Sequence, residues 1–196
     1  MRSRLPIATW PLMLSLACAA SALTCALTCT PAAAQSSAPQ RTAVSTETRV
    51  KAAYLFKLRN YVELAAPAAA GAEYVIGIVG ADEVADELAK IAGAAVGAPT
   101  RVRKLRAGDA LDGVSALFIG DGSWPNRALV ERAQAHRILI VADDDGALQQ
   151  GAVVNFLLQD ERVRFEVSIE SANRAGLRLD SRLLALATSV IKARSS

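Results

Sequence analysis

Cysteine and histidine are scarce in this chain of 196 residues, and their scarcity limits the chemistry it can perform. The three cysteines, Cys18, Cys25 and Cys29, all lie close to the N-terminus, and His136 is the single histidine. A domain that begins after these cysteines has no disulfide, no thiol nucleophile and no thiolate metal site. His136 falls at an expected helix-to-strand junction, where a solvated histidine is common. We therefore expect no catalytic residue, and the chain is interpreted as a non-enzyme.

Charged side chains are absent from Leu5 to Gln40. This stretch follows two arginines, has an apolar centre, "PLMLSLACAASALTCAL", and ends in "PAAAQ", whose alanines fit the small-residue rule for cleavage. Residues 1–34 are therefore predicted to be a secretory signal peptide, with a mature protein that begins near Gln35 and lies in the periplasm. An uncleaved membrane anchor is the alternative, because the stretch is long enough to span a bilayer.

An excess of positive charge is also missing from the mature chain. Without Arg2 and Arg4, 20 basic side chains stand against 19 acidic ones. Proteins that bind nucleic acid normally carry a basic patch, so nucleic acid is not an expected partner.

Residues 35–46 are rich in Ser, Ala, Pro and Gln and are predicted to be a flexible leader. Residues 47–196 are long enough for one domain with a sizeable core and are predicted to form a single α/β domain.

Apolar periodicity within this domain predicts helices and strands in alternation. Helices are expected over residues 47–64, 83–93 (with Asp82 as the N-cap), 126–135 and from about 180 to 191. Strands are expected over residues 74–80, 100–105, 114–120, 137–142, 153–159 and 162–168. Alternation of this kind favours parallel strands covered by helices. The predicted fold is an α/β three-layer sandwich with a mostly parallel mixed sheet and a C-terminal antiparallel hairpin.

Three short motifs suggest chemistry but lack residues that the chemistry needs. Gly77 and Gly80 of "VIGIVG" do not form the G-x-G-x-x-G pattern of dinucleotide sites. Ser123 of "GDGSW" lacks the second glycine of a nucleophile elbow. The acidic run "DDDG" at residues 143–146 has consecutive carboxylates, whereas calcium loops alternate their ligands with spacers. We expect neither a cofactor nor a metal ion, and we interpret the acidic run as a solvated loop.

The stretch "VVNFLLQDERVRFEVS", residues 153–168, predicts a β-hairpin because apolar and polar residues alternate around a polar turn. A two-residue loop at Asp160 and Glu161 would place Asn155 opposite Glu166. Glutamate seldom adopts the positive φ that such a loop needs, so a longer loop is the alternative. One face of the hairpin would be apolar, and the other would carry Val153, Asn155, Leu157, Arg164, Glu166 and Ser168.

Three blocks of the sequence together resemble the YfiR-like family of periplasmic proteins. They are "VKAAYLFKLRNYVEL", "ALFIG" and "VVNFLLQDERVRFEVSIESANRAGLRLDSRLLALA", and the last is the most specific because its parts follow the family's order and spacing. The resemblance implies a regulator that represses a membrane-bound diguanylate cyclase by sequestering its periplasmic region, which lowers cyclic di-GMP and biofilm formation. It also implies an outer-membrane lipoprotein as a candidate for releasing the regulator, and it leaves a homodimer open.

Two interpretations of the polar hairpin face remain open. Asn155, Arg164 and Glu166 either form a cross-strand cluster that stabilises the fold, or they bind a protein partner together with Leu157. Interfaces commonly combine apolar side chains with arginine. The candidate partner-binding residues are therefore Asn155, Leu157, Arg164 and Glu166.

A small-ligand function is the alternative to partner binding. In open α/β sheets, ligands bind at the carboxyl ends of the strands. These ends are expected near Gly80, Gly120 and Asp143, so the second interpretation is a periplasmic small-ligand sensor or solute-binding module.

Overall fold

The computed structural model describes residues 44–64, 73–97, 99–120, 122–123 and 127–192. The chain divides into two units, Met1–Gln40 and Arg41–Ser196, and the described residues all belong to the second. The predicted signal peptide, the three cysteines and most of the predicted leader lie outside the described residues. The domain boundaries at residues 34 and 46 therefore stay predictions.

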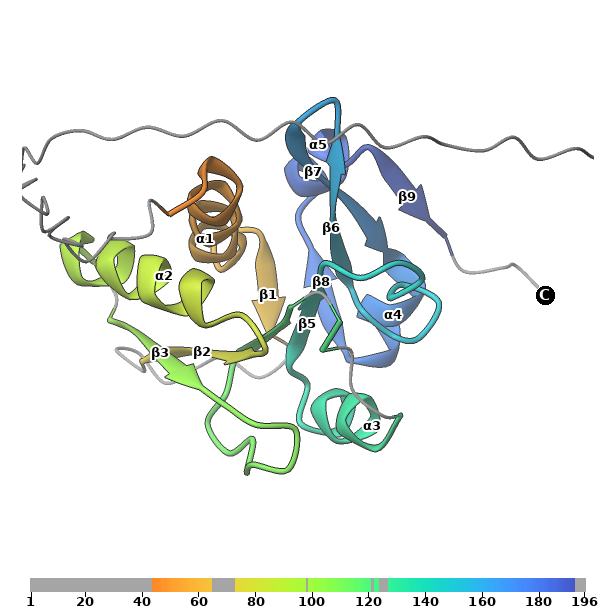
Figure 1. Cartoon of the computed structure of the whole chain (residues 1–196). Helices are drawn as coiled ribbons and strands as arrows, with labels where there is room; N and C mark the ends of the chain where they lie inside the picture. The colour runs from red at the N-terminus through yellow and green to blue at the C-terminus, as the bar shows by residue number, and fades with distance from the viewer. Residues whose placement is uncertain (1–43, 65–72, 98, 121, 124–126, 193–196) are drawn as a thin grey trace, which may run out of the picture. The chain divides into compact units, whose positions relative to one another are not determined.

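A seven-stranded mixed sheet forms the centre of the described domain (Figure 1). Its strand order is β3-β2-β4-β5-β6-β7-β9, and neighbouring strands are parallel except for the antiparallel pair β6 and β7. The predicted α/β fold with a C-terminal antiparallel hairpin is confirmed. The strands are β2 (Tyr74–Val79), β3 (Thr100–Lys104), β4 (Ala116–Ile119), β5 (Leu139–Ala142), β6 (Val154–Gln159), β7 (Arg162–Ser168) and β9 (Ser189–Ile191).

Helices cover both faces of this sheet. The described helices are α1 (Thr46–Leu58), α2 (Asp82–Ala94), α3 (Arg127–Ala135), α4 (Ile169–Arg174) and α5 (Ser181–Leu186). One core joins Ile76 and Phe118 to α1 and α2, and the other joins Leu117 and Ile140 to α3. Alternate strand residues thus enter opposite cores, which is why the parallel strands are continuous apolar runs. None of the described helices has the length and apolar character needed to cross a bilayer.

Two predicted helices end earlier in the structure than the sequence indicates. The helix expected over residues 47–64 ends at Leu58, and Val62–Leu64 forms β1, which pairs antiparallel with β8 (Leu177–Leu179). The C-terminal helix ends at Leu186, and β9 then pairs parallel with β7. Apolar residues in both segments also suit a strand, and each segment pairs with a strand that is distant in the sequence, β1 with β8 and β9 with β7. Asp82 is the first residue of α2, not its predicted N-cap.

Candidate functional site

The hairpin that carries the candidate residues closes through a two-residue loop. Asp160 and Glu161 have φ angles of 49° and 58°, the left-handed conformation that a type I′ turn requires at both positions. Leu158 lies opposite Val163, so the register is the one predicted for the shorter loop. Glu161 thus accepts a conformation that L-residues disfavour.

The apolar face of the hairpin packs against α1. Phe156 and Phe165 are opposite each other on β6 and β7, and both are buried. The ring of Tyr54 on α1 lies 6.0 Å from that of Phe156 and 5.7 Å from that of Phe165, centroid to centroid. These aromatic contacts fix the hairpin on the domain, so the residues on its other face have a rigid base.

Asn155 joins three segments on the polar face. Its Nδ2 donates to Oε1 of Glu166 at 3.2 Å, and its Oδ1 accepts the backbone N–H of Asp144 at 3.2 Å. The side chain of Glu166 is half-buried, whereas Asn155 is only 4% exposed. Asn155 therefore serves the fold, because it ties the loop after β5 to β7 and orients the Glu166 carboxylate.

Leu157 and Arg164 form the exposed part of the same face. They are direct cross-strand partners, with Leu157 half-buried and Arg164 exposed. Arg164 makes no side-chain hydrogen bond or ion pair within the described part of the chain, so the predicted polar trio separates into an Asn155–Glu166 pair and an arginine that faces solvent. The structure brings all four candidate residues together. We call Leu157, Arg164 and Glu166 the hairpin surface.

An acidic groove of about 370 Å³ borders the hairpin surface at Leu157. Lys51 of α1 lies inside it between two carboxylates, with Nζ 2.6 Å from Oε1 of Glu47 and 2.7 Å from Oδ2 of Asp143. The Asp143 side chain is only 8% exposed, so the predicted solvated loop is wrong at this position. The lining residues are Glu47, Lys51, Asp143, Asp144, Asp145, Phe156, Leu157 and Leu158.

The environment of Lys51 favours its charged form. Burial lowers its pKa, but hydrogen bonds to Asp143 and Glu47, together with their negative charges, outweigh burial and raise the pKa above its ordinary value of 10.5. The i,i+4 spacing of Glu47 and Lys51 is visible in the sequence. Asp143 is 92 residues from Lys51, and no sequence signal joins the two.

The strand ends named for the small-ligand interpretation do not form one site. The strand order reverses between β2 and β4, where open α/β sheets often hold a ligand. Here a Cβ on Gly120 would lie 2.8 Å from the carbonyl oxygen of Gly80, and a Cβ on Gly80 would lie 1.8 Å from Oγ of Ser123. The protein's own backbone and Ser123 therefore fill this crevice. Asp143 lines the acidic groove, and Gly80 lines a different cavity.

Comparison with known proteins supports the resemblance seen in the sequence. A family model described as YfiR/HmsC-like matches residues 48–188. A crystal structure of a conserved domain protein from Vibrio cholerae is 13% identical over 73% of the present chain and 60% of its own, with a TM-score of 0.48. The present chain thus spans less than two thirds of that protein's length. No match was found among curated proteins.

Proposed function

The chain belongs to the YfiR/HmsC-like family of periplasmic regulators of diguanylate cyclase signalling, and from this premise we propose that it represses an inner-membrane diguanylate cyclase by sequestering the cyclase's periplasmic region. Members of the family are regulatory proteins, which agrees with the scarcity of catalytic side chains in the sequence. Repression would lower cyclic di-GMP and, with it, biofilm formation. The proposed contact is the hairpin surface.

The observation that carries this proposal is the pairing of Leu157 with an exposed Arg164 on a rigid sheet. Arginine is enriched at protein interfaces, and the buried centres of interfaces are more apolar than their rims. Asn155 holds the Glu166 side chain, and the core fixes the strand backbone. Binding would therefore cost little conformational entropy on this side of the interface.

The hairpin surface defines the chemistry of its partner. A partner carboxylate opposite Arg164 would form a charge-assisted, bidentate pair. An apolar partner side chain would cover Leu157, which is half-buried beside the acidic groove. The proposed binding segment of the cyclase is therefore apolar with at least one acidic residue.

A cellular measurement tests this proposal. Cyclic di-GMP is measured in cells that contain the cyclase and either the natural regulator or Arg164→Glu. We expect Arg164→Glu to raise cyclic di-GMP to the level of cells without the regulator, with an unchanged amount of protein, because exposed changes alter stability by only about 0.5 kcal/mol. Lys90→Glu is the matched control, since Lys90 is exposed on α2 at the other edge of the sheet. Full repression by Arg164→Glu would contradict the proposal.

Release and self-association belong to the same proposal. An outer-membrane lipoprotein that binds the regulator would compete with the cyclase for it and so restore the activity of the cyclase.

A homodimer could form through β9, because edge strands can pair with a strand of a second copy. Light scattering of the purified protein, with and without the lipoprotein, distinguishes a monomer, a dimer and the mixed complex.

A further inference from the structure

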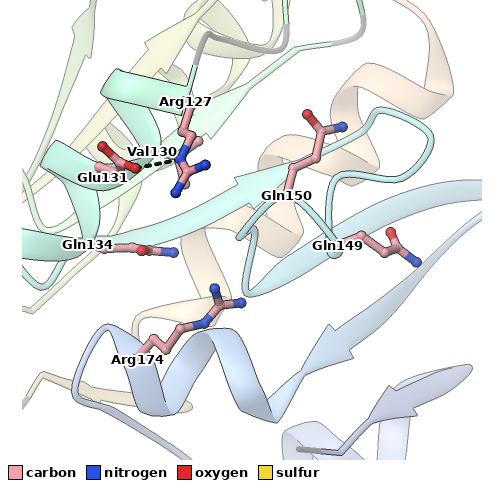
Figure 2. Close-up of a pocket in the computed structure, with 7 residues that line it drawn as sticks. All are labelled: Arg127, Val130, Glu131, Gln134, Gln149, Gln150 and Arg174. Carbon is pink, nitrogen blue, oxygen red and sulfur yellow. Dashed lines mark hydrogen bonds and ion pairs between the residues drawn. The ribbon is translucent and has the colours of Figure 1, made fainter.

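A pocket of about 310 Å³ lies between α3, α4 and the loop from β5 to β6 (Figure 2). Among the described residues it shares no lining residue with the acidic groove, and it contains none of the hairpin surface. Its volume is at the lower end of the range for small-molecule sites. It is lined by Arg127, Val130, Glu131, Gln134, Gln149, Gln150 and Arg174.

Two arginines from different helices direct their guanidinium groups into this pocket (Figure 2). Arg127 donates through Nε to Oε1 of Glu131 at 2.6 Å, which leaves both Nη groups for a ligand. Arg174 uses Nη2, which lies 3.4 Å from Oγ of Ser171 and 3.8 Å from Oε1 of Glu170. Its Nε and Nη1 have no acceptor among the described residues, but they lie on opposite edges of the guanidinium, so the converging pair of donors is Nη1 with the second hydrogen of Nη2. Each guanidinium therefore keeps the edge formed by its two Nη groups for an anion.

Gln134 adds a neutral donor whose position is fixed by close packing. Its Nε2 lies 3.5 Å from the carbonyl oxygen of Gly151. Gly151 has a φ of 114°, and a Cβ there would lie 2.7 Å from Cγ1 of Val130 and 2.8 Å from Nε2 of Gln134. Glycine allows the loop to approach α3 this closely. The part of the lining formed by Val130 and Gln134 thus packs closely against the loop at Gly151.

We propose that this pocket binds a small oxyanion, a carboxylate or phosphate group of a small molecule, through Arg127, Arg174 and Gln134. The planar guanidinium fork matches both groups. Glu131 and Glu170 are 59% and 50% exposed, so their ion pairs with the arginines are weak and an anion can compete with them. Arg127 and Arg174 are themselves 91% and 51% exposed, so the anion is expected to bind weakly. A bound anion would connect α3 to α4. The site is independent of the proposed cyclase contact and would give the regulator a small-ligand input.

The test is a nuclear magnetic resonance titration of the purified protein with inorganic phosphate and, separately, with succinate. We expect saturable chemical-shift changes at Gln134 and Arg174 at millimolar probe concentration. The probe that binds more tightly identifies phosphate or carboxylate as the ligand group. Succinamide, which is neutral, should cause no such shifts. Bound ligand should also raise the melting temperature, because it binds only the folded protein.

Variants decide whether the pocket binds the anion. Arg174→Gln should weaken binding about tenfold, as expected for losing a charge-assisted contact. Arg132→Gln removes a charge from an exposed position of α3 outside the pocket and should leave binding unchanged. Arg127→Lys keeps the charge but loses the fork, so it should bind with intermediate affinity. The proposal would be overturned if neither probe gave saturable shifts or if Arg174→Gln bound the probes as tightly as the natural protein. It would also be overturned if Arg174→Gln and Arg132→Gln lost the same amount of affinity.

Discussion

Lys51→Met is expected to lower the free energy of unfolding by about 3 kcal/mol, because it removes the positive charge beside a nearly buried carboxylate. Nζ of Lys51 lies 2.7 Å from Oδ2 of Asp143, with the two side chains 14% and 8% exposed. Methionine has a similar length and a similar helix propensity. The substitution therefore changes the charge in the acidic groove more than the packing of α1.

The magnitude follows from the geometry of this pair. At 2.7 Å and an effective dielectric constant of about 20, the attraction is about 6 kcal/mol, part of which offsets the desolvation of both groups. After the substitution, Asp143 keeps its desolvation penalty and loses the attraction of Lys51, a change that typically costs about 3 to 5 kcal/mol. Glu47 is 40% exposed, so water can enter the groove, and the lower end of that range applies.

Urea unfolding of Lys51→Met and a matched control provides the assay. Lys90→Met breaks the Lys90–Glu87 pair, which is 2.9 Å long but has a lysine that is 65% exposed, so it should cost less than about 1 kcal/mol. Adding Asp143→Asn to Lys51→Met should recover part of the loss, because the desolvated charge is then absent. Equal losses in Lys51→Met and Lys90→Met would refute the reasoning.

Three further predictions concern backbone strain and pH. Glu161→Gly should stabilise the hairpin by about 1 kcal/mol in thermal melts, since glycine adopts the positive φ of the turn without strain. Gly151→Ala should cost about 1 to 3 kcal/mol, because the added methyl group meets Val130 and Gln134 at positive φ; unchanged stability would contradict the packing described for the loop. The raised pKa of Lys51 means that the folded state holds this proton more tightly than the unfolded state does. The contribution of charged Lys51 to the free energy of unfolding is therefore complete below the ordinary pKa of 10.5, and it is lost as pH rises through the folded-state pKa. Urea unfolding at increasing alkaline pH should show this loss, and Lys51→Met should lack it.

The elements predicted correctly from the sequence are those with strong local signals. The strands β2, β4 and β5 are apolar runs because they are buried on both faces between helices. The hairpin register follows from strict alternation and from the two residues available for the turn. Asn155, Leu157, Arg164 and Glu166 could therefore be placed on one face before any coordinates were known.

The features that the sequence did not predict depend on long-range contacts. β1, β8 and β9 have three residues each, too few for a recognisable period, and β1 pairs with β8, which lies far from it in the sequence. The Lys51–Asp143 pair and the pocket between Arg127 and Arg174 join side chains from separate helices and loops. No spacing within one segment encodes such contacts, so they appear only once the chain is folded.

The central claim is that the hairpin surface binds the periplasmic region of the cyclase. Chemical-shift mapping of the labelled protein, titrated with that purified region, tests it most directly. We predict that the largest changes occur at Leu157, Arg164 and Glu166 on β6 and β7, while α2 and β3 at the opposite edge of the sheet stay unchanged. The account would be contradicted if the cyclase region did not bind, or if it bound without changing the chemical shifts of β6 and β7.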